Sequence, residues 1–217
     1  MNSLSLVTPA DADAAAPRVA AHLERGGLLA YPTETVYGIG SRLLEGDLAA
    51  LATLTHRPAG KPFLVLVAGK KMLHDINLRF TVAADRLAAR FWPGPLTLVL
   101  DSGEANLPPQ LRGKNGGIAV RWSSHSATSR LIERLEMPIS STSANLSGRE
   151  PQTDAAGIIS EFEDAANSSK LLVLDGGAIP KAASSTLVDC TSSEPIILRE
   201  GAVSHGRITA CLEEVGN

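Results

Sequence analysis

The sequence predicts an α/β fold, a single-domain twisted open mixed sheet with flanking helices. Short apolar runs recur along the 217 residues, and stretches with helical spacing lie between several of them. Several runs are continuously apolar, which is typical of strands covered on both faces, while the strand-rich last third of the chain indicates a mixed sheet. No internal repeat and no linker rich in proline or serine interrupts the chain. We therefore expect one domain over residues 1–217, with a core of about 16–204.

The expected elements alternate along the chain. Helices are expected where apolar residues recur every three to four positions, over residues 14–25, 47–56, 83–91, 126–136 and 154–162. Strands are expected at apolar runs bounded by Gly, Pro or Asp, over residues 28–31, 63–67, 96–100, 118–122, 171–174, 186–188 and 196–198. Residues 104–117 are rich in proline, glycine and asparagine, which predicts a long loop of a kind that is often functional.

Composition excludes several classes of protein. Hydrophobic residues make up 44% of the chain and charged residues 20%, with a formal net charge of −3. This much apolar surface excludes a disordered chain. The near-neutral balance gives no general basic surface for nucleic acid, so any such contact must be local.

Neither a membrane nor a metal is expected as a partner. The longest apolar runs, such as residues 63–68, are far shorter than a bilayer span, and the N-terminus lacks a basic and apolar leader. The two cysteines, Cys190 and Cys211, fit a reducing compartment, and no Cys/His ligand spacing occurs. These features predict a cytoplasmic protein without a metal site of its own.

The first segment with chemical potential is Tyr31–Gly40, which directly follows a predicted buried strand. Ligands of open α/β sheets bind at the carboxyl ends of strands. Thr33 and Thr35 offer hydroxyls there, and two glycines permit a close backbone approach. A polar strand-to-helix connection with Tyr37 packed in the core explains the same pattern equally well.

The second segment, His56–Pro62, places Arg57 and Lys61 in a turn between a predicted helix and a predicted strand. Two cations four residues apart can hold phosphate oxygens, with Arg as a planar fork and Lys as a point charge. Pairing of these cations with the dipole at the helix C-terminus is the commoner use of such residues.

The third segment, Ser140–Gly148, is dense in small hydroxyl and amide side chains. Such side chains suit an anionic or nucleotide ligand, because each supplies a hydrogen bond without bulk. They also cap turns and helices, which is the competing interpretation. Three further candidates, Arg121, Ser185 and Arg199, lie on or beside predicted strands, where an arginine usually projects into solvent.

No phosphate loop, dinucleotide fingerprint, nucleophile elbow or zinc-protease motif occurs. Instead, residues from about Val19 to Val203 resemble the YrdC/Sua5 family of threonylcarbamoyl-AMP synthases. The resemblance rests on ordered motifs: YPTETVYGIG, HRP with the following KP, FWPGPLTLVL, AVRW, STSANLSG, SSTLVD and ILREG. The length resembles the single-domain form of the family, and FWPGP is interpreted as a rigid turn.

The resemblance implies an enzyme that condenses L-threonine, bicarbonate and ATP into threonylcarbamoyl-AMP and releases pyrophosphate. The product serves threonylcarbamoyladenosine modification at position 37 of tRNA, through a downstream threonylcarbamoyl transferase machinery. Residues at the family's threonine positions are Thr33, Arg121, Ser141 and Ser185. Residues at its ATP positions are Arg57, Gly117, Ser143, Asn145, Pro151 and Arg199.

The residue types suit that chemistry. Arg121 is expected to clamp the amino-acid carboxylate, while Arg57 and Arg199 offset the charge of the triphosphate. We predict Arg57 and Lys61 as the catalytic cations. Mg²⁺ is expected to arrive with ATP, held mainly by phosphates and water.

Three positions depart from the family pattern. Thr55 stands where the family usually has a lysine, Leu66 where many members have a histidine, and Ser184 where an acidic residue is common. Because of Thr55, a divergent paralogue with another acyl or carbamoyl substrate stays open as an alternative. A second alternative is an RNA-binding module, because proteins of this fold have been thought to offer a basic concave surface to RNA. The second would use a local basic cleft of Arg57, Lys61, Arg112, Lys114, Arg121 and Arg199.

Overall fold

A ten-stranded mixed sheet runs through the computed structural model, which describes residues 3–213. Its strand order is β1-β8-β2-β3-β7-β4-β6-β5-β9-β10. The pairs β1/β8, β8/β2, β4/β6 and β5/β9 are parallel and the other neighbours antiparallel, which confirms the predicted mixed sheet. The strands are Ser3–Ser5 (β1), Leu28–Tyr31 (β2), Gly38–Gly40 (β3), Leu64–Leu66 (β4), Leu96–Leu100 (β5), Ile118–Arg121 (β6), Ile139–Ser143 (β7), Leu171–Asp175 (β8), Thr186–Asp189 (β9) and Ile196–Arg199 (β10).

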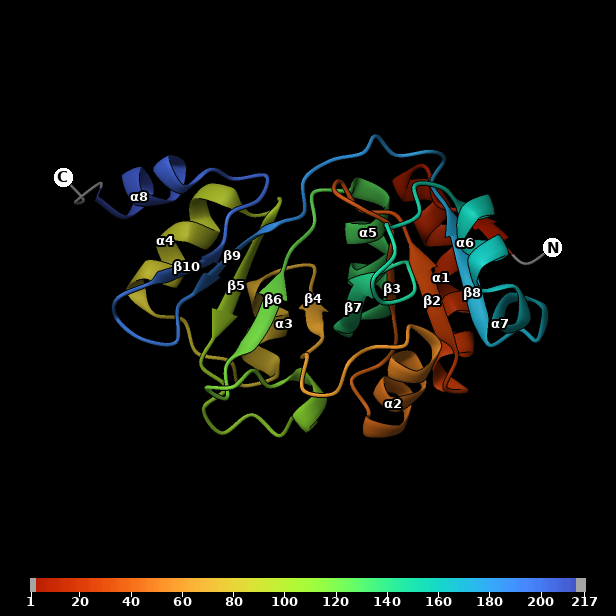
Figure 1. The fold of residues 1–217 in the computed structure, drawn as a ribbon, viewed down its shortest axis with the longest axis horizontal. Helices are drawn as coiled ribbons and strands as arrows, with labels where there is room; N and C mark the ends of the chain where they lie inside the picture. The colour runs from red at the N-terminus through yellow and green to blue at the C-terminus, as the bar shows by residue number, and fades with distance from the viewer. Residues whose placement is uncertain (1–2, 214–217) are drawn as a thin grey trace.

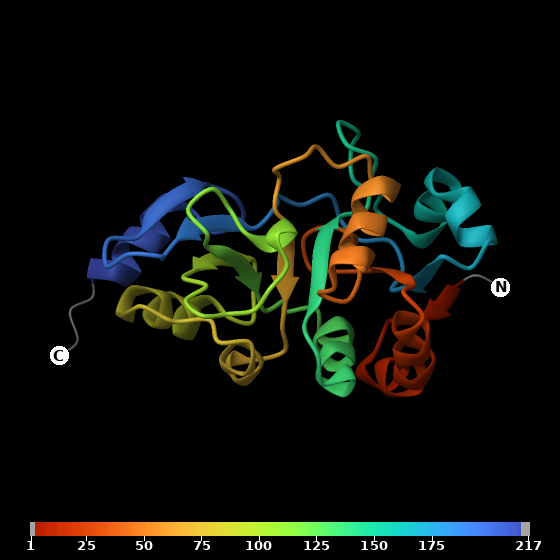
Figure 2. The same ribbon diagram turned by 90° about the horizontal axis from the view of Figure 1, so that it is seen from below.

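Helices cover the sheet unevenly. Figure 2 shows α1, α3, α4 and α5 along one side of the sheet, with α2, α6 and α7 on the other side. Figure 1 places β8, β2 and α1 at one end of the molecule and β9, β10 and α8 at the other. The helices are Pro9–Glu24 (α1), Glu45–Leu54 (α2), Lys70–Asp75 (α3), Val82–Phe91 (α4), Ser126–Leu135 (α5), Ala155–Glu161 (α6), Glu163–Asn167 (α7) and His205–Glu213 (α8), with a 3₁₀ turn at Pro109–Leu111.

Local sequence explains where the helices start. The Thr8 side chain accepts a hydrogen bond from the backbone of Asp11, whose carboxylate bonds back to Thr8, so α1 begins with a capping box. Asp154 caps α6 through the backbone N–H of Gly157. His125 caps α5, with its Nδ1 accepting from the N–H of Thr128.

Most predicted elements are confirmed, and the differences have physical causes. The predicted helix over 154–162 is split at Phe162 into α6 and α7. The apolar pattern does not predict strands β1, β3 and β7, because they are short, glycine-rich or built of serine and threonine instead of apolar residues. Helices α3 and α8 are also absent from the prediction. Among the helices of the described residues, none is both long and apolar enough to cross a bilayer.

The segment after β2 combines both interpretations offered for it. Residues 38–40 turn back as β3, antiparallel to β2, so the chain runs from strand to strand and not from strand to helix. Tyr37 is fully buried, and its hydroxyl donates to the carbonyl oxygen of Gly177 at 2.7 Å. The core therefore fixes Tyr37 and leaves residues 33–36 as a short polar loop at the end of β2.

Candidate active site

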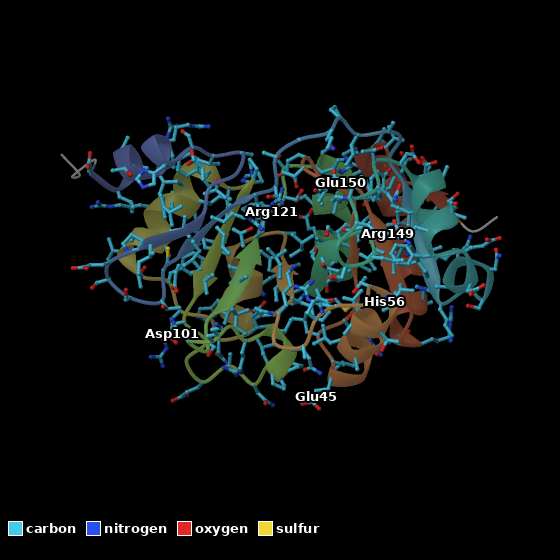
Figure 3. All side chains as sticks on the ribbon, viewed as in Figure 1. Glu45, His56, Asp101, Arg121, Arg149 and Glu150 are labelled. Atoms are coloured by element: carbon cyan, nitrogen blue, oxygen red, sulfur yellow. The ribbon has the colours of Figure 1, made fainter. Side chains whose placement is uncertain are left out.

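A cavity of about 410 Å³ lies on one face of the sheet, over its central strands. Loops 33–36 and 57–62 contribute to its wall, as do residues of β3, β4, β5, β6, β7, β9 and β10. Figure 3 shows Arg121 in this central region, far from peripheral residues such as Asp101. The predicted site residues that line the cavity are Thr33, Arg57, Lys61, Arg121, Ser141, Ser143, Pro151, Ser185 and Arg199.

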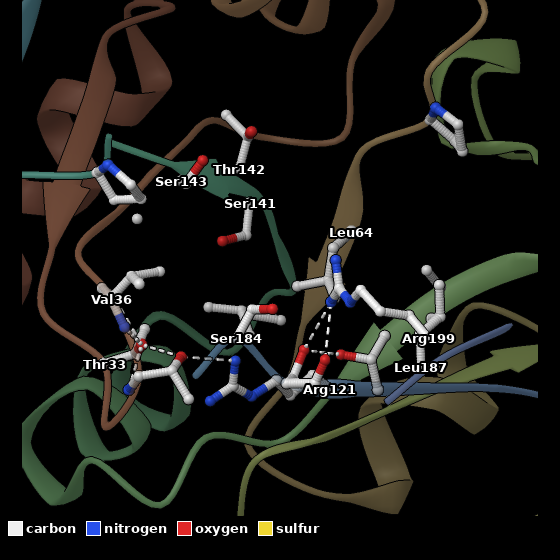
Figure 4. A pocket seen from close by; sticks show the side chains of 18 of the residues that line it. Thr33, Val36, Leu64, Arg121, Ser141, Thr142, Ser143, Ser184, Leu187 and Arg199 are labelled. Atoms are coloured by element: carbon white, nitrogen blue, oxygen red, sulfur yellow. Dashed lines mark hydrogen bonds between the residues drawn. The ribbon is translucent and has the colours of Figure 1, made fainter. Parts of the chain in front are cut away.

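Strand periodicity explains the cavity floor. Alternate residues of a strand point to the same face. Leu64 and Leu66 of β4 line the cavity, and so do Ala119 and Arg121 of β6. Strand β7 departs from this alternation, because residues 141, 142 and 143 all line the cavity (Figure 4). The segment Ser140–Gly148 is thus a strand followed by a loop, and not only a capped turn.

One end of the cavity holds buried hydroxyls around a buried arginine. Thr33, Arg121, Ser141 and Ser185 are each 8% exposed or less. The Thr33 hydroxyl donates to the carbonyl oxygen of Val36 at 2.6 Å and lies 3.0 Å from the hydroxyl of Thr35. Thr33, Arg121, Ser141 and Ser185 are the residues predicted to bind threonine, and they converge from two strands and two loops.

Arg121 is held on three sides. Its Nη1 donates to the Thr35 hydroxyl at 3.0 Å, and its Nε donates to the carbonyl oxygen of Gly94 at 3.3 Å. Its Nη2 lies 2.8 Å from Oε1 of Glu34, but without the alignment of a hydrogen bond. The strand therefore ends in an arginine that is fixed inside the protein, contrary to the usual solvent exposure of such residues.

Glu34 is a site residue that the sequence reasoning does not single out. Besides Arg121, it contacts the hydroxyl of Ser123 and accepts from the N–H of Ser124 at 3.2 Å. Burial alone raises the pKa of Glu34, but the positive charge of Arg121 and the hydrogen bond with Ser123 outweigh it, so the pKa stays below its usual value. Glu34 is thus ionised and ties the 33–36 loop to the end of β6.

The predicted turn FWPGP supports the same arginine. Gly94 provides the carbonyl that accepts from Arg121, and its N–H donates to the carbonyl oxygen of Trp122 at 2.8 Å. The indole N–H of Trp92 donates to the carbonyl oxygen of Leu96 at 2.7 Å. This turn therefore positions a site residue while adding none of its own residues to the cavity wall.

A second arginine reaches the cavity from β10. Nη2 of Arg199 donates to the carbonyl oxygen of Ser185 at 2.8 Å, and the Ser185 hydroxyl lies 2.7 Å from that of Thr97 (Figure 4). Partial burial and then the nearby charge of Arg121 lower the pKa of Arg199. Two positive side chains thus approach the same cavity, and of these two only Arg121 has a carboxylate partner within residues 3–213.

Arg57 stands at the opposite end. Its Nε donates to the carbonyl oxygen of Lys61 at 2.9 Å, its Nη1 to the hydroxyl of Thr142 at 2.7 Å, and its Nη2 to the carbonyl oxygen of Pro62 at 2.5 Å. The guanidinium also lies 4.3 Å from the ring centre of Phe63. Burial lowers the pKa of Arg57 to about 10, so the group still carries its charge at neutral pH.

Thr55 closes a small recess behind this end. The recess has a volume of about 60 Å³ and is shared by Thr55, Arg57, Lys61, Ser143 and Asn145, among others. The Thr55 hydroxyl donates to the carbonyl oxygen of Leu51 at 2.8 Å, so its proton is used at the end of α2 and is not free for a ligand. Lys61, on the other side of the turn, also lines this recess.

The structure brings together all predicted site residues but one. Asn145 lies in the small recess: its amide N–H groups donate to the carbonyl oxygens of Leu146 and Arg149, and its Oδ1 is buried without a partner in the described chain. Gly117 does not reach the cavity. A Cβ at Gly117 would lie 2.6 Å from Val99 and 2.7 Å from Thr191, so strand packing requires this glycine.

A metal at this site would depend on ligands other than a protein cage. Within residues 3–213, no group of three or more His, Cys, Asp or Glu side chains is placed to bind one. Oxygen ligands for a divalent ion at this cavity would have to come mainly from a bound substrate and water.

The chain matches a known family over most of its length. The family model Sua5_yciO_yrdC, described as "Telomere recombination", matches residues 21–201. A threonylcarbamoyl-AMP synthase of Pyrococcus abyssi is 35% identical over 91% of this chain and 57% of its own length. One from Chromohalobacter salexigens is 39% identical over 85% of this chain and 97% of its own length. The chain thus spans little more than half of some of these relatives and nearly all of others.

Solved structures share the fold. The structure of P. abyssi Sua5 complexed with L-threonine superposes with a TM-score of 0.85 at 31% identity, covering 99% of this chain and 62% of that chain. E. coli YciO superposes with a TM-score of 0.78 at 22% identity, covering 95% and 96%. The second likeness concerns the fold alone. The family match and these relatives establish that the chain belongs to the Sua5/YciO/YrdC family.

Proposed function

We propose that the chain is a threonylcarbamoyl-AMP synthase, a nucleotidyltransferase that condenses L-threonine, bicarbonate and ATP and releases pyrophosphate. The observation that carries this proposal is the two-ended cavity. One end offers a buried arginine among hydroxyls, and the other offers two cations without carboxylate partners in the described chain. Relatives that bear this name, and a relative solved with L-threonine, support the assignment.

The first end suits an amino acid. Arg121 lines the cavity with its charge held in place, and its guanidinium suits a carboxylate. The hydroxyls of Thr33, Ser141 and Ser185 are small donors and acceptors for the remaining polar groups of threonine. The leucines of β4 and Ala119 provide apolar surface for its methyl group.

The second end suits the phosphates of ATP. The amine of threonine and bicarbonate first form a carbamate with loss of water. The next step joins a carbamate oxygen to the α-phosphorus and breaks the bond from that phosphorus to the bridging oxygen, so the electron pair leaves with pyrophosphate. Charge therefore grows on the departing group. Arg57 and Lys61 at this end are cations without carboxylate partners in the described chain, and they can offset this charge. Arg199, which bonds to Ser185 near Arg121, adds a third such cation to the cavity. Further contacts for the nucleotide come from Ser143, Asn145 and Pro151.

Positioning and electrostatics are sufficient for this chemistry. No covalent enzyme intermediate is required, because carbamate and ATP react directly once they are aligned. The carbamate is labile, so the apolar floor of Leu64 and Leu66 helps by limiting water. Mg²⁺, when bound with ATP, would supply further charge for the phosphates.

The product must be consumed by a downstream threonylcarbamoyl transferase that modifies adenosine 37 of tRNA, and we place both steps in the cytoplasm. The geometry does not favour an RNA-binding module. Arg57 and Arg121 line a cavity that fits a small molecule, and Arg121 is 6% exposed. A weak local contact with tRNA is not needed for the activity that we propose.

The test is product analysis. Pyrophosphate should be released from ATP only when threonine and bicarbonate are both present, and mass spectrometry should detect threonylcarbamoyl-AMP. Serine should react less well, although one missing methyl group is worth only about 1 to 3 kcal/mol. Pyrophosphate release that ignores threonine would overturn the assignment and favour the divergent paralogue.

A further inference from the structure

A second cleft adjoins the cavity behind the 57–62 loop. It has a volume of about 370 Å³ and lies between that loop, the end of α2 and residues 109–112. Arg57, Lys61 and Pro62 line both this cleft and the main cavity. The two spaces are therefore separated by side chains of one short turn and not by a wall of the core.

All charged side chains that line the second cleft are basic. Arg112 joins Arg57 and Lys61, and the lining residues include no aspartate or glutamate from the described chain. None of these three cations forms an ion pair with a carboxylate within residues 3–213. Charges held together without counterions repel one another, so such a cleft is a site for an anion.

The cations keep donors available. Arg57 uses one N–H on each of its three nitrogens, which leaves one on Nη1 and one on Nη2. Arg112 donates from Nη1 to the Ser102 hydroxyl and from Nη2 to the carbonyl oxygen of Ala105, both at 2.6 Å. The Nε–H of Arg112 has no partner among the described residues. Both arginines are thus anchored by some donors and open through others.

Gln110 adds an acceptor to the same cleft. Its Oε1 is buried without a hydrogen-bond partner in the part of the chain that the structure describes, whereas its Nε2 donates to the carbonyl oxygen of Glu45 at 3.4 Å. Because this oxygen accepts and does not donate, it adds no direct contact for an anion, and the attraction of the cleft for an anion comes from its three cations.

We propose that the second cleft is a subsite for inorganic pyrophosphate, which receives this product as it leaves the main cavity. This inference rests on the proposed function. Arg57 and Lys61 contact both spaces, so the anion can move between them without losing its countercharge. A cleft of about 370 Å³ that adjoins the main cavity suits a small polyanion better than an RNA backbone, which binds along extended basic surfaces.

Ala59 offers a clean way to test the subsite. It lines the second cleft, is exposed, and does not line the main cavity or the small recess. Ala59→Asp adds one negative charge to the cleft without removing a side-chain contact, and Ala59→Asn is its neutral match. The dissociation constant of pyrophosphate, titrated calorimetrically into each protein without ATP, should rise about tenfold in Ala59→Asp relative to Ala59→Asn.

Arg112 gives an independent variant. Arg112→Gln should weaken pyrophosphate binding and product inhibition by pyrophosphate, whereas Lys114→Gln, which removes an exposed charge two residues away, should not. The KM for threonine should stay unchanged in both. Arg112 also anchors residues 102–105, so Arg112→Gln could lower the melting temperature. In that case the comparison of Ala59→Asp with Ala59→Asn alone tests the subsite.

The outcomes separate the subsite from the proposed function. Equal pyrophosphate affinities in Ala59→Asp and Ala59→Asn overturn the subsite, even when the enzyme makes threonylcarbamoyl-AMP. A charge effect on pyrophosphate binding in a protein that makes no such product supports the cleft and refutes the function. If Ala59→Asp weakens the binding of an RNA oligonucleotide but not of pyrophosphate, the cleft belongs to RNA and the proposal is wrong.

Discussion

The two ends of the main cavity treat positive charge in opposite ways. At one end, Arg121 is 6% exposed and lies beside the carboxylate of Glu34. At the other, the hydrogen bonds of Arg57 within the described chain go to two carbonyl oxygens and a hydroxyl, and Lys61 has no carboxylate partner there. Arg121 is thus neutralised in advance, whereas Arg57 and Lys61 keep their charge for a ligand.

This difference matches the ligands that we propose. An amino-acid carboxylate carries one charge, so an arginine fixed by Glu34 and Thr35 gains more from correct orientation than from excess charge. A triphosphate carries several charges, which increase on the leaving group during the reaction. Cations without counterions are suited to that change, at some cost to stability.

The largest effect is expected at the neutralised end. Arg121→Gln should reduce threonine-dependent pyrophosphate release by about 1,000-fold, because the carboxylate clamp is removed. It should also lower the free energy of unfolding by about 3 kcal/mol, since Glu34 is left largely buried without its cation. Activity is measured by pyrophosphate release and stability by urea unfolding.

Arg57→Gln is the matched variant at the other end. It should raise the KM for ATP strongly and lower the free energy of unfolding by about 1 kcal/mol, less than Arg121→Gln does, because hydrogen bonds are lost but no buried carboxylate loses its partner. If both variants destabilise the protein equally, the contrast between the two ends is wrong.

The next effect concerns Lys61. Lys61→Ala should reduce turnover by about 100-fold, the scale observed when one preorganised charge-stabilising group is removed. The Ala variant retains the carbonyl that accepts from Arg57, so the turn itself should persist. Lys114→Ala, which removes an exposed lysine that does not line the cavity, serves as the control and should be active.

Thr55→Lys in the Lys61→Ala background should restore part of the loss, because Thr55 and Lys61 line the same small recess. Turnover of Lys61→Ala at the wild-type rate would make Lys61 a solvated turn residue. An inactive wild-type protein that is activated by Thr55→Lys alone would identify a repurposed paralogue.

How far the sequence predicts this site depends on the element that carries each residue. Leu96–Leu100 and Ile118–Arg121 are mainly apolar runs, so their strands are visible in the sequence and Arg121 is placed correctly at a strand end. Strand β7 has no such run, because four of its five residues are serine or threonine and resemble a turn. That strand lies between β3 and β4 in the sheet, and pairing with these neighbours makes it a strand.

Glu34 could not be assigned a role from spacing. Its partners Arg121 and Ser123 are almost 90 residues away. Strands β3, β7 and β4 lie between β2 and β6 in the sheet, so the contact is a tertiary one that no local pattern predicts. Gly117 shows the opposite case. The resemblance implies a nucleotide contact for it, which stays a prediction, whereas the structure places it outside the cavity wall and close to Val99 and Thr191.

A pH titration sharpens the contrast at a smaller scale. The folded state holds the pKa of Glu34 below its ordinary value of 4.5. The stability that this carboxylate contributes is therefore complete above the unfolded pKa and is lost as the pH falls through the folded pKa. Wild type should be more stable than Glu34→Gln by about 1 to 2 kcal/mol at neutral pH.

The difference in unfolding free energy between the two proteins should shrink when urea unfolding is repeated at pH values below about 4.5, because both side chains are then increasingly neutral. A difference that stays constant down to about pH 3 would show that the loss in Glu34→Gln comes from shape and not from charge.

The smallest effect separates two neighbours at the phosphate end. The Ser143 hydroxyl faces the cavity and forms no hydrogen bond with the described chain, so Ser143→Ala should raise the KM for ATP about fivefold, equivalent to about 1 kcal/mol, and leave the melting temperature unchanged. Asn145 differs, because its amide group donates at 2.8 Å to the carbonyl oxygens of Leu146 and Arg149. Asn145→Ala should therefore weaken ATP binding and also lower the melting temperature by a few degrees, since two loop carbonyls lose their donor. Calorimetric titration with ATP and thermal unfolding measure the two quantities. If Asn145→Ala changes only the melting temperature, the buried Oδ1 is not a nucleotide contact and Asn145 serves the loop alone.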